Sequence, residues 1–388
     1  MWPTLLLTLP WVGVIAFLVL VARPPRELPR AEDLGRAPLV SVIVPARNEE
    51  QNIGTCVGSL LASTYPSFEV IVVDDGSEDR TADIVRGMER GNAREVRLLQ
   101  GGELPAGWLG KPWACRRGAE VARGDLLLFT DADTRHAPDL LSRAVAALDE
   151  DRADLLTVIG SQLMETVWER LVQPQIFMLM LFRFPDLDRT ARSASAWDAI
   201  ANGQYLLFTR EGYEAVGGHA AVRLEVAEDL ALAQRVKREG RSLSIRGSQD
   251  GLATRMYRSL AEIREGWSKN LYVGGLQTLP PWLRPLAAPL SLATGIVLWI
   301  APPVTLVLAL AGVGSTATFV WSASACGLSV LIWTAFLREM EVPLGYAPLY
   351  PVGAAVSAYI FARSWTRGRR VEWKGRRYTL PPSEPGGA

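Results

Sequence analysis

The pattern of apolar and polar positions divides the chain into an apolar N-terminal run, a central region of short alternating elements and an apolar C-terminal region. Trp2–Ala22 is about as long as a bilayer-spanning helix, and it is followed by Arg23, Arg26 and Arg30. A signal peptide is the competing interpretation, but no basic stretch precedes the run and no clear small-residue cleavage site follows it. We therefore expect an uncleaved transmembrane anchor over residues 1–24, with the next region in the cytoplasm.

Between residues 37 and 284 the pattern first changes to short apolar stretches separated by amphipathic ones. The apolar stretches predict strands at Leu39–Val44, Val70–Val73, Val96–Leu99 and Asp125–Thr130. The amphipathic stretches predict helices at Glu49–Leu61, Thr81–Met88 and Pro112–Ala122. This alternation is typical of a Rossmann-like α/β domain, with a mostly parallel sheet covered by helices on both faces. Ligands of such sheets bind beyond the carboxyl ends of the strands.

The part of this region that begins near Leu155 is less regular. It contains Val172–Phe184, which is too short to span a bilayer yet rich in Phe, Met and Leu. Two interpretations remain open, a buried core helix and an interfacial segment that contacts the membrane and an apolar substrate.

Residues 285–363 form a predicted transmembrane region of two or three spans, followed by a basic tail over residues 364–388. The candidate spans are Leu286–Gly312, Thr318–Leu337 and Leu344–Ala362. Three full crossings would place the tail outside, against the positive-inside rule. We therefore expect one candidate not to cross, and Pro302-Pro303 makes the first of them the leading suspect, as a kinked or re-entrant segment.

The tail is basic at Arg367, Arg369, Arg370, Lys374, Arg376 and Arg377. Anionic lipid headgroups explain this run more simply than a polynucleotide does, because the 41 basic and 41 acidic residues of the whole chain balance. We expect no nucleic-acid partner. The last residues, Pro381–Ala388, have a composition typical of disorder.

Composition supports a membrane protein and disfavours several classes of site. The hydrophobic content of 49% is high for a wholly soluble chain. Three widely spaced cysteines (Cys56, Cys115 and Cys326) and two histidines predict neither a disulfide framework nor a zinc site, and they fit a reducing compartment. The motifs GxGxxG and GxxxxGK[ST] are absent, which disfavours dinucleotide redox chemistry and P-loop hydrolysis.

Acidic side chains follow three of the predicted strands. Asp131-Ala-Asp133 comes directly after one strand, and Asp-x-Asp in this position suits a hard divalent cation whose other ligands are phosphate and water. Pro45–Glu50 and Asp74–Ser77 follow the other two. Each stretch also has a local explanation, because polar turns are common after strands and Asn48 is a candidate helix N-cap. Their coincidence at one edge of the sheet favours a nucleotide whose charge is masked by a metal.

Five motifs in register resemble those of family 2 glycosyltransferases with the GT-A fold. They are Ser41–Glu50, Val72–Ser77, Gly110-Lys111 with Ala114, Asp131–Asp133 and Glu228–Leu230. The resemblance covers Leu39–Asn270 in the order and spacing of the family. It implies a uridine pocket that is lined by Pro45, Arg47, Glu49, Asp74 and Asp75.

The resemblance also assigns roles to the charged residues of the other motifs. It implies that Lys111 reaches the base or the diphosphate, that Asp131 reaches the ribose or the metal, and that Asp133 binds the metal, Mg²⁺ or Mn²⁺. Lys111 lies where a turn enters a predicted helix, whose N-terminal amides favour negative charge. A solvated surface lysine is the alternative.

Glu228 and Asp229 open the amphipathic stretch Val226–Val236. Acidic residues in a first helical turn are stabilised by the helix dipole without any catalytic role. The resemblance implies that Asp229 is the general base that accepts the proton of the acceptor. The preceding loop, which contains Gln204, resembles an acceptor-side loop.

Processive members of the family carry Gln-x-x-Arg-Trp, and this chain has Arg264–Asn270 in its place. Trp267 is a candidate stacking face for a sugar, and Arg264 or Lys269 is a candidate cation for the diphosphate. An interfacial amphipathic helix is the alternative. The missing motif indicates a single transfer rather than polymer synthesis.

A finer resemblance is to the membrane-bound glycosyltransferases associated with carotenoid and hopanoid synthesis, particularly the diaponeurosporenoate type. It is carried by Gly107–Trp113, Val226–Asp229, Arg255–Tyr257 and Glu265–Asn270. It implies an inverting, metal-dependent, non-processive hexosyltransferase of a bacterial inner membrane, which moves glucose or another hexose from a UDP-sugar to a carotenoid acid or other isoprenoid lipid. The alternatives are a transferase acting on polyprenyl phosphate or diacylglycerol, and a non-catalytic membrane scaffold that binds a nucleotide sugar.

Overall fold

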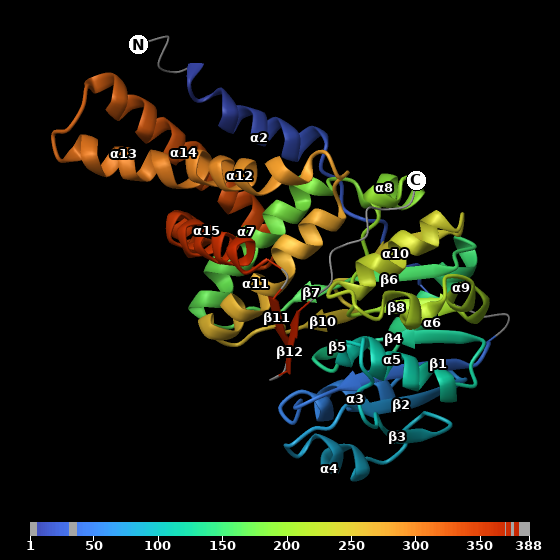
Figure 1. Ribbon diagram of the computed structural model, residues 1–388. Coiled ribbons are helices and arrows are strands. Elements are labelled where there is room, and N and C mark those ends of the chain that lie inside the picture. Colours follow the sequence, from blue (N-terminus) through green and yellow to red (C-terminus); the bar gives the residue numbers. More distant parts are fainter. Residues whose placement is uncertain (1–5, 31–36, 369, 374–375, 380–388) are drawn as a thin grey trace.

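The computed structural model describes residues 6–30, 37–368, 370–373 and 376–379. A sheet covered by helices forms one end of the molecule, and long apolar helices project from the other end (Figure 1). The predicted class, a mostly parallel α/β fold with transmembrane helices, is confirmed. The first residues of the predicted anchor, 2–5, and the tail end Pro381–Ala388 lie outside the described residues.

The main sheet has the strand order β3-β2-β1-β4-β8-β6-β9. Its strands are β1 (Val40–Ala46), β2 (Phe68–Asp74), β3 (Val96–Gln100), β4 (Leu126–Phe129), β6 (Leu155–Ile159), β8 (Leu206–Thr209) and β9 (Leu243–Gly247). Neighbouring strands are parallel except at β8, which is antiparallel to both β4 and β6. Phe129 pairs with Leu206, so the start of β8 lies at the edge where the parallel strands end. The four strands predicted before Thr130 are confirmed.

Alternating side chains of the sheet serve two separate cores. In β1, Val42 and Val44 pack into the core that contains residues of α3, α4 and α6, while Ile43 packs into the core of α5, α9 and α10. These helices are α3 (Ile53–Leu61), α4 (Thr81–Arg86), α5 (Gly110–Val121), α6 (Leu140–Glu150), α9 (Arg210–Ala215) and α10 (Glu228–Arg238). A Cβ at Gly118 would clash with Ile43, so glycine lets α5 lie directly on the sheet.

The expected helix start at Asn48 is wrong. Helix α3 begins at Ile53, and Asn48 has a left-handed backbone with φ of 53°. Its side-chain oxygen accepts a hydrogen bond from the backbone N–H of Glu78 at 2.8 Å, and its own N–H donates to Ser77 Oγ at 3.0 Å. Asn48 therefore joins the loops after β1 and β2 instead of capping a helix.

A smaller sheet and three further helices precede the apolar helices in the chain. The elements are β5 (Thr134–His136), β7 (Ser161–Gln162), β10 (Leu252–Thr254), α7 (Val167–Arg183), α8 (Leu187–Arg192) and α11 (Leu260–Gln277). Helix α7 contains most of the segment with two open interpretations, and it has features of both. Val172 and Ile176 are buried against a core shared with α11 and α15 (Tyr350–Arg367), whereas Leu179 and Met180 are exposed.

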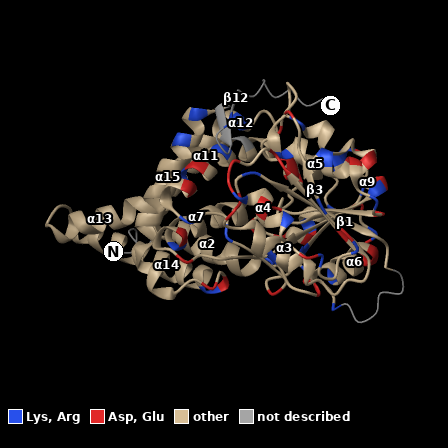
Figure 2. Ribbon diagram, turned by 90° about the horizontal axis from the view of Figure 1, so that it is seen from below, with Lys and Arg blue, Asp and Glu red and all other residues tan. Residues whose placement is uncertain are grey.

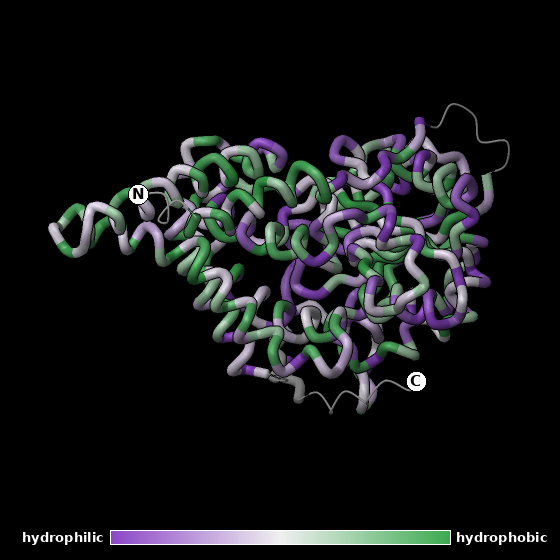
Figure 3. Tube along the Cα trace, turned by 90° about the horizontal axis from the view of Figure 1, so that it is seen from above, coloured by the Kyte–Doolittle hydropathy of each residue, from purple (hydrophilic) through white to green (hydrophobic). Residues whose placement is uncertain are grey.

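Three helices have the length and composition of membrane spans, Arg284–Leu310, Thr316–Glu339 and Leu344–Arg367, as predicted. The first comprises α12 (Arg284–Gly295), a π-helical turn (Ile296–Ile300) and α13 (Ala301–Leu310); the second is α14 (Thr316–Glu339); the third comprises a 3-10 helix (Leu344–Leu349) and α15. The projecting end that contains α13 lacks the dense charge of the sheet end (Figure 2), and this end is largely hydrophobic in Figure 3. The three helices therefore indicate membrane association.

Pro302-Pro303 lies near the start of α13, directly after the π-helical turn, and the helical residues continue through it. The expectation that this segment is kinked or re-entrant and does not cross stays a prediction. The π-helical turn directly before the prolines widens the helix, which accommodates their rings. Pro302 cannot donate to the carbonyl of Leu298, and the indole N–H of Trp11 donates to it instead at 3.2 Å. Trp11 belongs to α2 (Leu9–Leu20), which at 12 residues is shorter than the predicted anchor Trp2–Ala22.

Candidate active site

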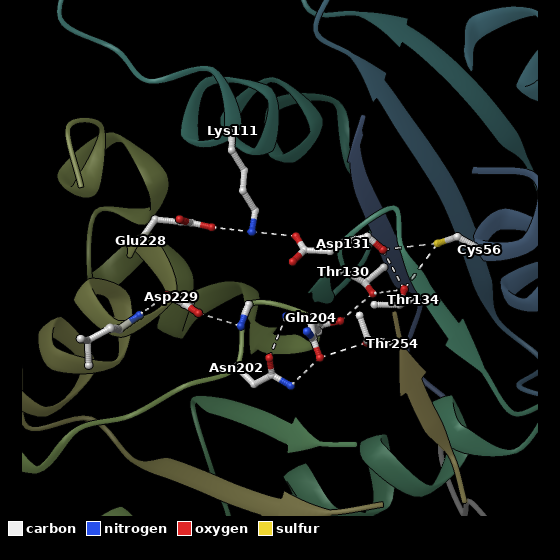
Figure 4. Close-up of polar contacts among 12 residues, drawn as sticks. Cys56, Lys111, Thr130, Asp131, Thr134, Asn202, Gln204, Glu228, Asp229 and Thr254 are labelled. Carbon is white, nitrogen blue, oxygen red and sulfur yellow. Dashed lines mark hydrogen bonds and ion pairs between the residues drawn. The ribbon is translucent and has the colours of Figure 1, made fainter. Parts of the chain in front are cut away.

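Four of the predicted site residues meet at the carboxyl edge of the main sheet (Figure 4). Lys111 lies in the first turn of α5, Asp131 follows β4, and Glu228 and Asp229 open α10. The Lys111 ammonium is 2.7 Å from Asp131 Oδ1 and also 2.7 Å from Glu228 Oε1. A lysine bound by two carboxylates is not the solvated surface residue of the alternative interpretation.

The charges around Lys111 keep it protonated. Burial disfavours the ammonium, but the carboxylates of Asp131, Glu228 and Asp229 more than compensate, and together they raise the pKa of Lys111 well above its usual value. The site therefore presents a permanent cation surrounded by acids. Such a cation can exchange its carboxylate partners for the oxygens of a diphosphate.

Asp229 is held in place by backbone N–H groups. Its Oδ2 accepts from Gly203 at 2.8 Å, and its Oδ1 accepts from Leu230 at 2.7 Å. Burial and the neighbouring charge of Glu228 raise the pKa of Asp229 to about 6, while Lys111 acts in the opposite direction. A carboxylate with this pKa is suited to accepting a proton near neutral pH.

Asp133 has the features of a carboxylate that can bind a cation. Its Oδ1 is buried and has no hydrogen-bond partner among the described residues. Burial, Asp131 and Glu49 raise the pKa of Asp133 to about 8, because three acids face one another. Within the described ranges, no three His, Cys, Asp or Glu residues form a preformed metal cage. Asp133 and Asp131 thus fit a cation that takes most of its ligands from phosphate and water.

The residues predicted for the uridine pocket lie on the adjacent loops. Arg47 is buried and donates to the backbone oxygens of Asp75 at 2.5 Å and Gly76 at 3.1 Å. Asp74 Oδ1 accepts from the N–H of Ser77 at 3.0 Å, which closes the turn after β2. Glu49 accepts from Asn52 at 2.9 Å.

A buried polar network beneath the site connects the ends of β4 and β10 to the loop before β8. Thr130 Oγ1 donates to the backbone oxygen of Gln204 at 2.7 Å, and Thr254 Oγ1 donates to its side-chain oxygen at 3.0 Å. His136 contacts Thr130 and Thr134, and burial lowers its pKa to about 3, so it is neutral. Gln204, predicted on the acceptor side, therefore braces the loop whose Gly203 holds Asp229 (Figure 4).

One large cavity, of about 1200 Å³, contains this site. Among the predicted site residues it is lined by Pro45, Arg47, Glu49, Lys111, Asp131, Asp133, Gln204, Glu228, Asp229, Trp267 and Lys269. Its apolar lining includes Phe177, Leu179, Met180, Leu271, Phe336, Met340 and Val342. The cavity therefore joins charged residues of the sheet edge to apolar residues of α7, α11 and the end of α14.

Three predicted site residues lie outside this cavity lining. Asp74 and Asp75 are buried beside it, and Arg264 is exposed on α11. Trp267 is buried in edge contacts with Phe177 and Tyr257.

Sequence reasoning missed two contributors to the site. Arg376 of the basic tail donates to Asp75 Oδ2 at 2.5 Å, although the tail was expected at lipid headgroups. The segment Glu339–Val342 lines the cavity directly after a predicted span. No local motif marks either one, because both depend on contacts between segments far apart in the sequence.

Comparisons with known proteins agree with this architecture. A model of glycosyl transferase family 2 matches residues 41–208. The 4,4'-diaponeurosporenoate glycosyltransferase of Staphylococcus aureus strain MRSA252 is 26% identical over 362 residues, and the match covers 88% of each chain. The protein of the same name from strain USA300 is 27% identical over 354 residues, again with 88% of each chain covered.

A solved structure shares the fold across nearly the whole chain. It is a mannosyltransferase from Pyrobaculum calidifontis in complex with GDP-Man and Mn²⁺, 20% identical, with a TM-score of 0.53. The match covers 92% of this chain and 96% of that one. The chain therefore contains a glycosyltransferase family 2 domain of the GT-A fold and is related to the diaponeurosporenoate glycosyltransferases.

Proposed function

We propose that the protein is an inverting, metal-dependent hexosyltransferase that transfers one hexose, glucose in the first instance, from a UDP-sugar to a membrane lipid. The family 2 domain and the names of the relatives support a transferase with a lipid-like acceptor. One observation carries the proposal: the Lys111–Glu228–Asp229 cluster lines the same cavity as apolar residues of the membrane-proximal helices. A hydrophilic donor and an apolar acceptor can meet in such a cavity.

On the donor side, the proposed uridine pocket combines three residues of the cavity lining with two buried carboxylates outside it. They are Pro45, Arg47 and Glu49, with Asp74 and Asp75. Asp133 and Asp131 would hold Mg²⁺ or Mn²⁺, which when bound neutralises charge on the departing diphosphate. Lys111 remains protonated and offers a second positive charge at the same place. The unpartnered oxygen of Asp133 and the mutual repulsion of the acids support this assignment.

On the acceptor side, Asp229 acts as the general base. An acceptor hydroxyl attacks the anomeric carbon opposite the UDP, its proton passes to Asp229, and the bond from the sugar to UDP breaks. This single in-line displacement inverts the configuration at the anomeric carbon. A carboxylic acid acceptor is already ionised near neutral pH, so Asp229 would then only position it.

The lipid chain would lie along α11, where Gly274 and Gly275 line the cavity. Glycine in a helix costs about 1 kcal/mol relative to alanine, so two adjacent glycines call for a reason. A Cβ at either position would meet nothing within 4 Å, so no close packing requires them. Open space beside a helix, in a cavity that Leu179 and Met180 also line, suits a bound hydrocarbon chain.

For the membrane region, we propose that α12–α13 and α14 cross as a hairpin while α15 lies at the interface. Helix α15 packs against α7 and α11, and Arg376 at the start of the second strand after it contacts Asp75 at the end of β2. An even number of crossings between the catalytic domain and the tail satisfies the positive-inside rule. We propose that the catalytic domain lies in the cytoplasm, at the inner membrane, and the arginines after the N-terminal run support this orientation.

A UDP-release assay on membranes that contain the protein tests for catalysis. We expect UDP release from a UDP-hexose that requires a divalent cation and endogenous lipid. Release that is no faster than in membranes lacking the protein, for every UDP-hexose tried, would favour a non-catalytic nucleotide-sugar-binding scaffold. Label recovered on polyprenyl phosphate or diacylglycerol would instead favour the alternative acceptors.

A further inference from the structure

The end of the chain returns to the donor side of the active site. Helix α15 ends at Arg367, whose guanidinium is 2.5 Å from Glu265 of α11. The strands β11 (Arg370–Trp373) and β12 (Arg376–Thr379) then pair as a hairpin, which lies beside α11 in Figure 1. Because α15 is tied to α11, the position of this hairpin is set by the membrane-proximal helices.

The side chain of Arg376 binds both the carboxylate and the backbone oxygen of Asp75. Its Nη1 donates to Asp75 Oδ2 at 2.5 Å, and its Nη2 donates to the Asp75 backbone oxygen at 3.4 Å. Arg376 retains 25% of its side-chain exposure, whereas Asp75 retains only 1%. The pair therefore joins a residue at the surface to a carboxylate that is covered by protein.

The two oxygens of Asp75 have different environments. Oδ1 lies 3.6 Å from the position that a Cβ on Gly101 would occupy, so it faces the backbone beyond β3. Among the described residues, it is buried without a hydrogen-bond partner. Oδ2 is the oxygen that Arg376 binds. The carboxylate edge that remains for an incoming donor group is therefore the one that Arg376 occupies.

Asp75 lies outside the lining of the cavity. Neighbouring donor-side residues, including Arg47 and Glu49, line that cavity, but Asp75 does not. A planar guanidinium presents N–H donors to a carboxylate much as the N3–H edge of a uracil does. Arg376 thus stands where a nucleobase would bind Asp75.

We propose that Arg376 competes with the nucleobase for Asp75, so that the β11–β12 hairpin must leave this position before the donor binds fully. This inference rests on the proposed function, because it takes Asp75 as a uridine-binding residue. Its consequence is that donor affinity is reduced by the fraction of molecules with the hairpin docked. A device of this kind couples donor binding to the membrane-proximal helices that position the hairpin.

The test is a titration of the purified full-length protein with UDP in the presence of Mg²⁺. Arg376→Gln removes the competing charge, and we expect UDP to bind about five-fold more tightly, since a partly exposed ion pair contributes about 1 kcal/mol. Arg376→Lys keeps the charge and should stay close to the wild-type affinity. Arg90→Gln removes an exposed arginine of the same domain and serves as the matched control.

A second measurement does not depend on a variant. UDP should accelerate tryptic cleavage of the tail at residues 370–377 in the wild-type protein, because the docked hairpin is released. Weaker or unchanged UDP binding by Arg376→Gln, or protection of the tail by UDP, would overturn the proposal. If the wild-type protein does not bind UDP at all, the proposed function itself fails, which is a different result.

Discussion

The most specific chemical prediction concerns Asp229, the proposed general base. Asp229→Asn removes the ability to accept a proton and keeps nearly the same volume. Its side-chain oxygen can keep one of the two hydrogen bonds, from Gly203 or Leu230, while its amide faces the other donor. The substitution also removes a negative charge beside Lys111.

The expected loss depends on the acceptor. Removal of a general base typically slows a reaction by about 10²–10⁴-fold, which corresponds to about 3–5 kcal/mol of activation free energy. We expect a loss in this range for an alcohol acceptor. A carboxylate acceptor carries no proton to remove, so Asp229→Asn should lose much less activity with it.

The pKa of Asp229 also predicts how the activity of the wild-type enzyme changes with pH. The pKa of Asp229 is raised to about 6, so the base is active above that pH and protonated below it. At pH 5 about one tenth of the molecules would hold an ionised Asp229, so transfer to an alcohol should fall about ten-fold between pH 7 and pH 5.

The assay measures labelled hexose in extracted lipid, with an alcohol and a carboxylic acid acceptor of similar chain length in parallel. UDP binding by Asp229→Asn confirms that the donor site is intact, and Asp149→Asn at an exposed position of α6 is the matched control. Equal losses on both acceptors would refute the proton-transfer argument. Undiminished transfer to the alcohol would refute the assignment of Asp229 as the base.

Three further predictions address the rest of the site. Asp133→Ala should abolish cation-dependent turnover, and unchanged UDP-hexose turnover would exclude Asp133 as a metal ligand. Gly275→Phe should fill the space beside α11 and reduce transfer to long-chain lipids at least ten-fold, while UDP binding stays normal. Gly275→Ala is the control. Equal activity of the two variants would contradict the proposed path of the lipid chain. Glu228→Gln removes a charge that raises the pKa of Asp229, so the acidic limb of the pH profile should move to lower pH, and a shift to higher pH would contradict that electrostatic account.

Much of the fold could be predicted from hydrophobic patterning. Buried strands such as Val40–Ala46 are apolar at nearly every position, and such strands between amphipathic helices indicate a parallel sheet. The sheet then places Asp131 and Asp75 at one edge without further information. Asn48 was misassigned because capping residues are equally suited to joining two loops, and only the position of Glu78 selects between these roles.

The parts that could not be predicted depend on long-range packing. The pairing of Arg376 with Asp75 joins residues 301 positions apart, and a basic tail has the same composition whether it contacts lipid or protein. The Leu298 carbonyl, which Pro302 leaves without its helical donor, accepts from the indole of Trp11, which lies near the other end of the chain. The apolar wall of the cavity is similarly assembled from α7, α11 and α14, none of which carries a motif for a lipid.

The most direct test of the proposed function is incubation of membranes containing the protein with a panel of radiolabelled UDP-sugars, followed by lipid extraction. The proposal predicts that label from one UDP-hexose, with glucose the first expectation, appears in the lipid fraction only when a divalent cation is present. It also predicts one sugar per lipid. Label that remains entirely in the aqueous phase with every sugar, or that appears in a polysaccharide, would contradict it.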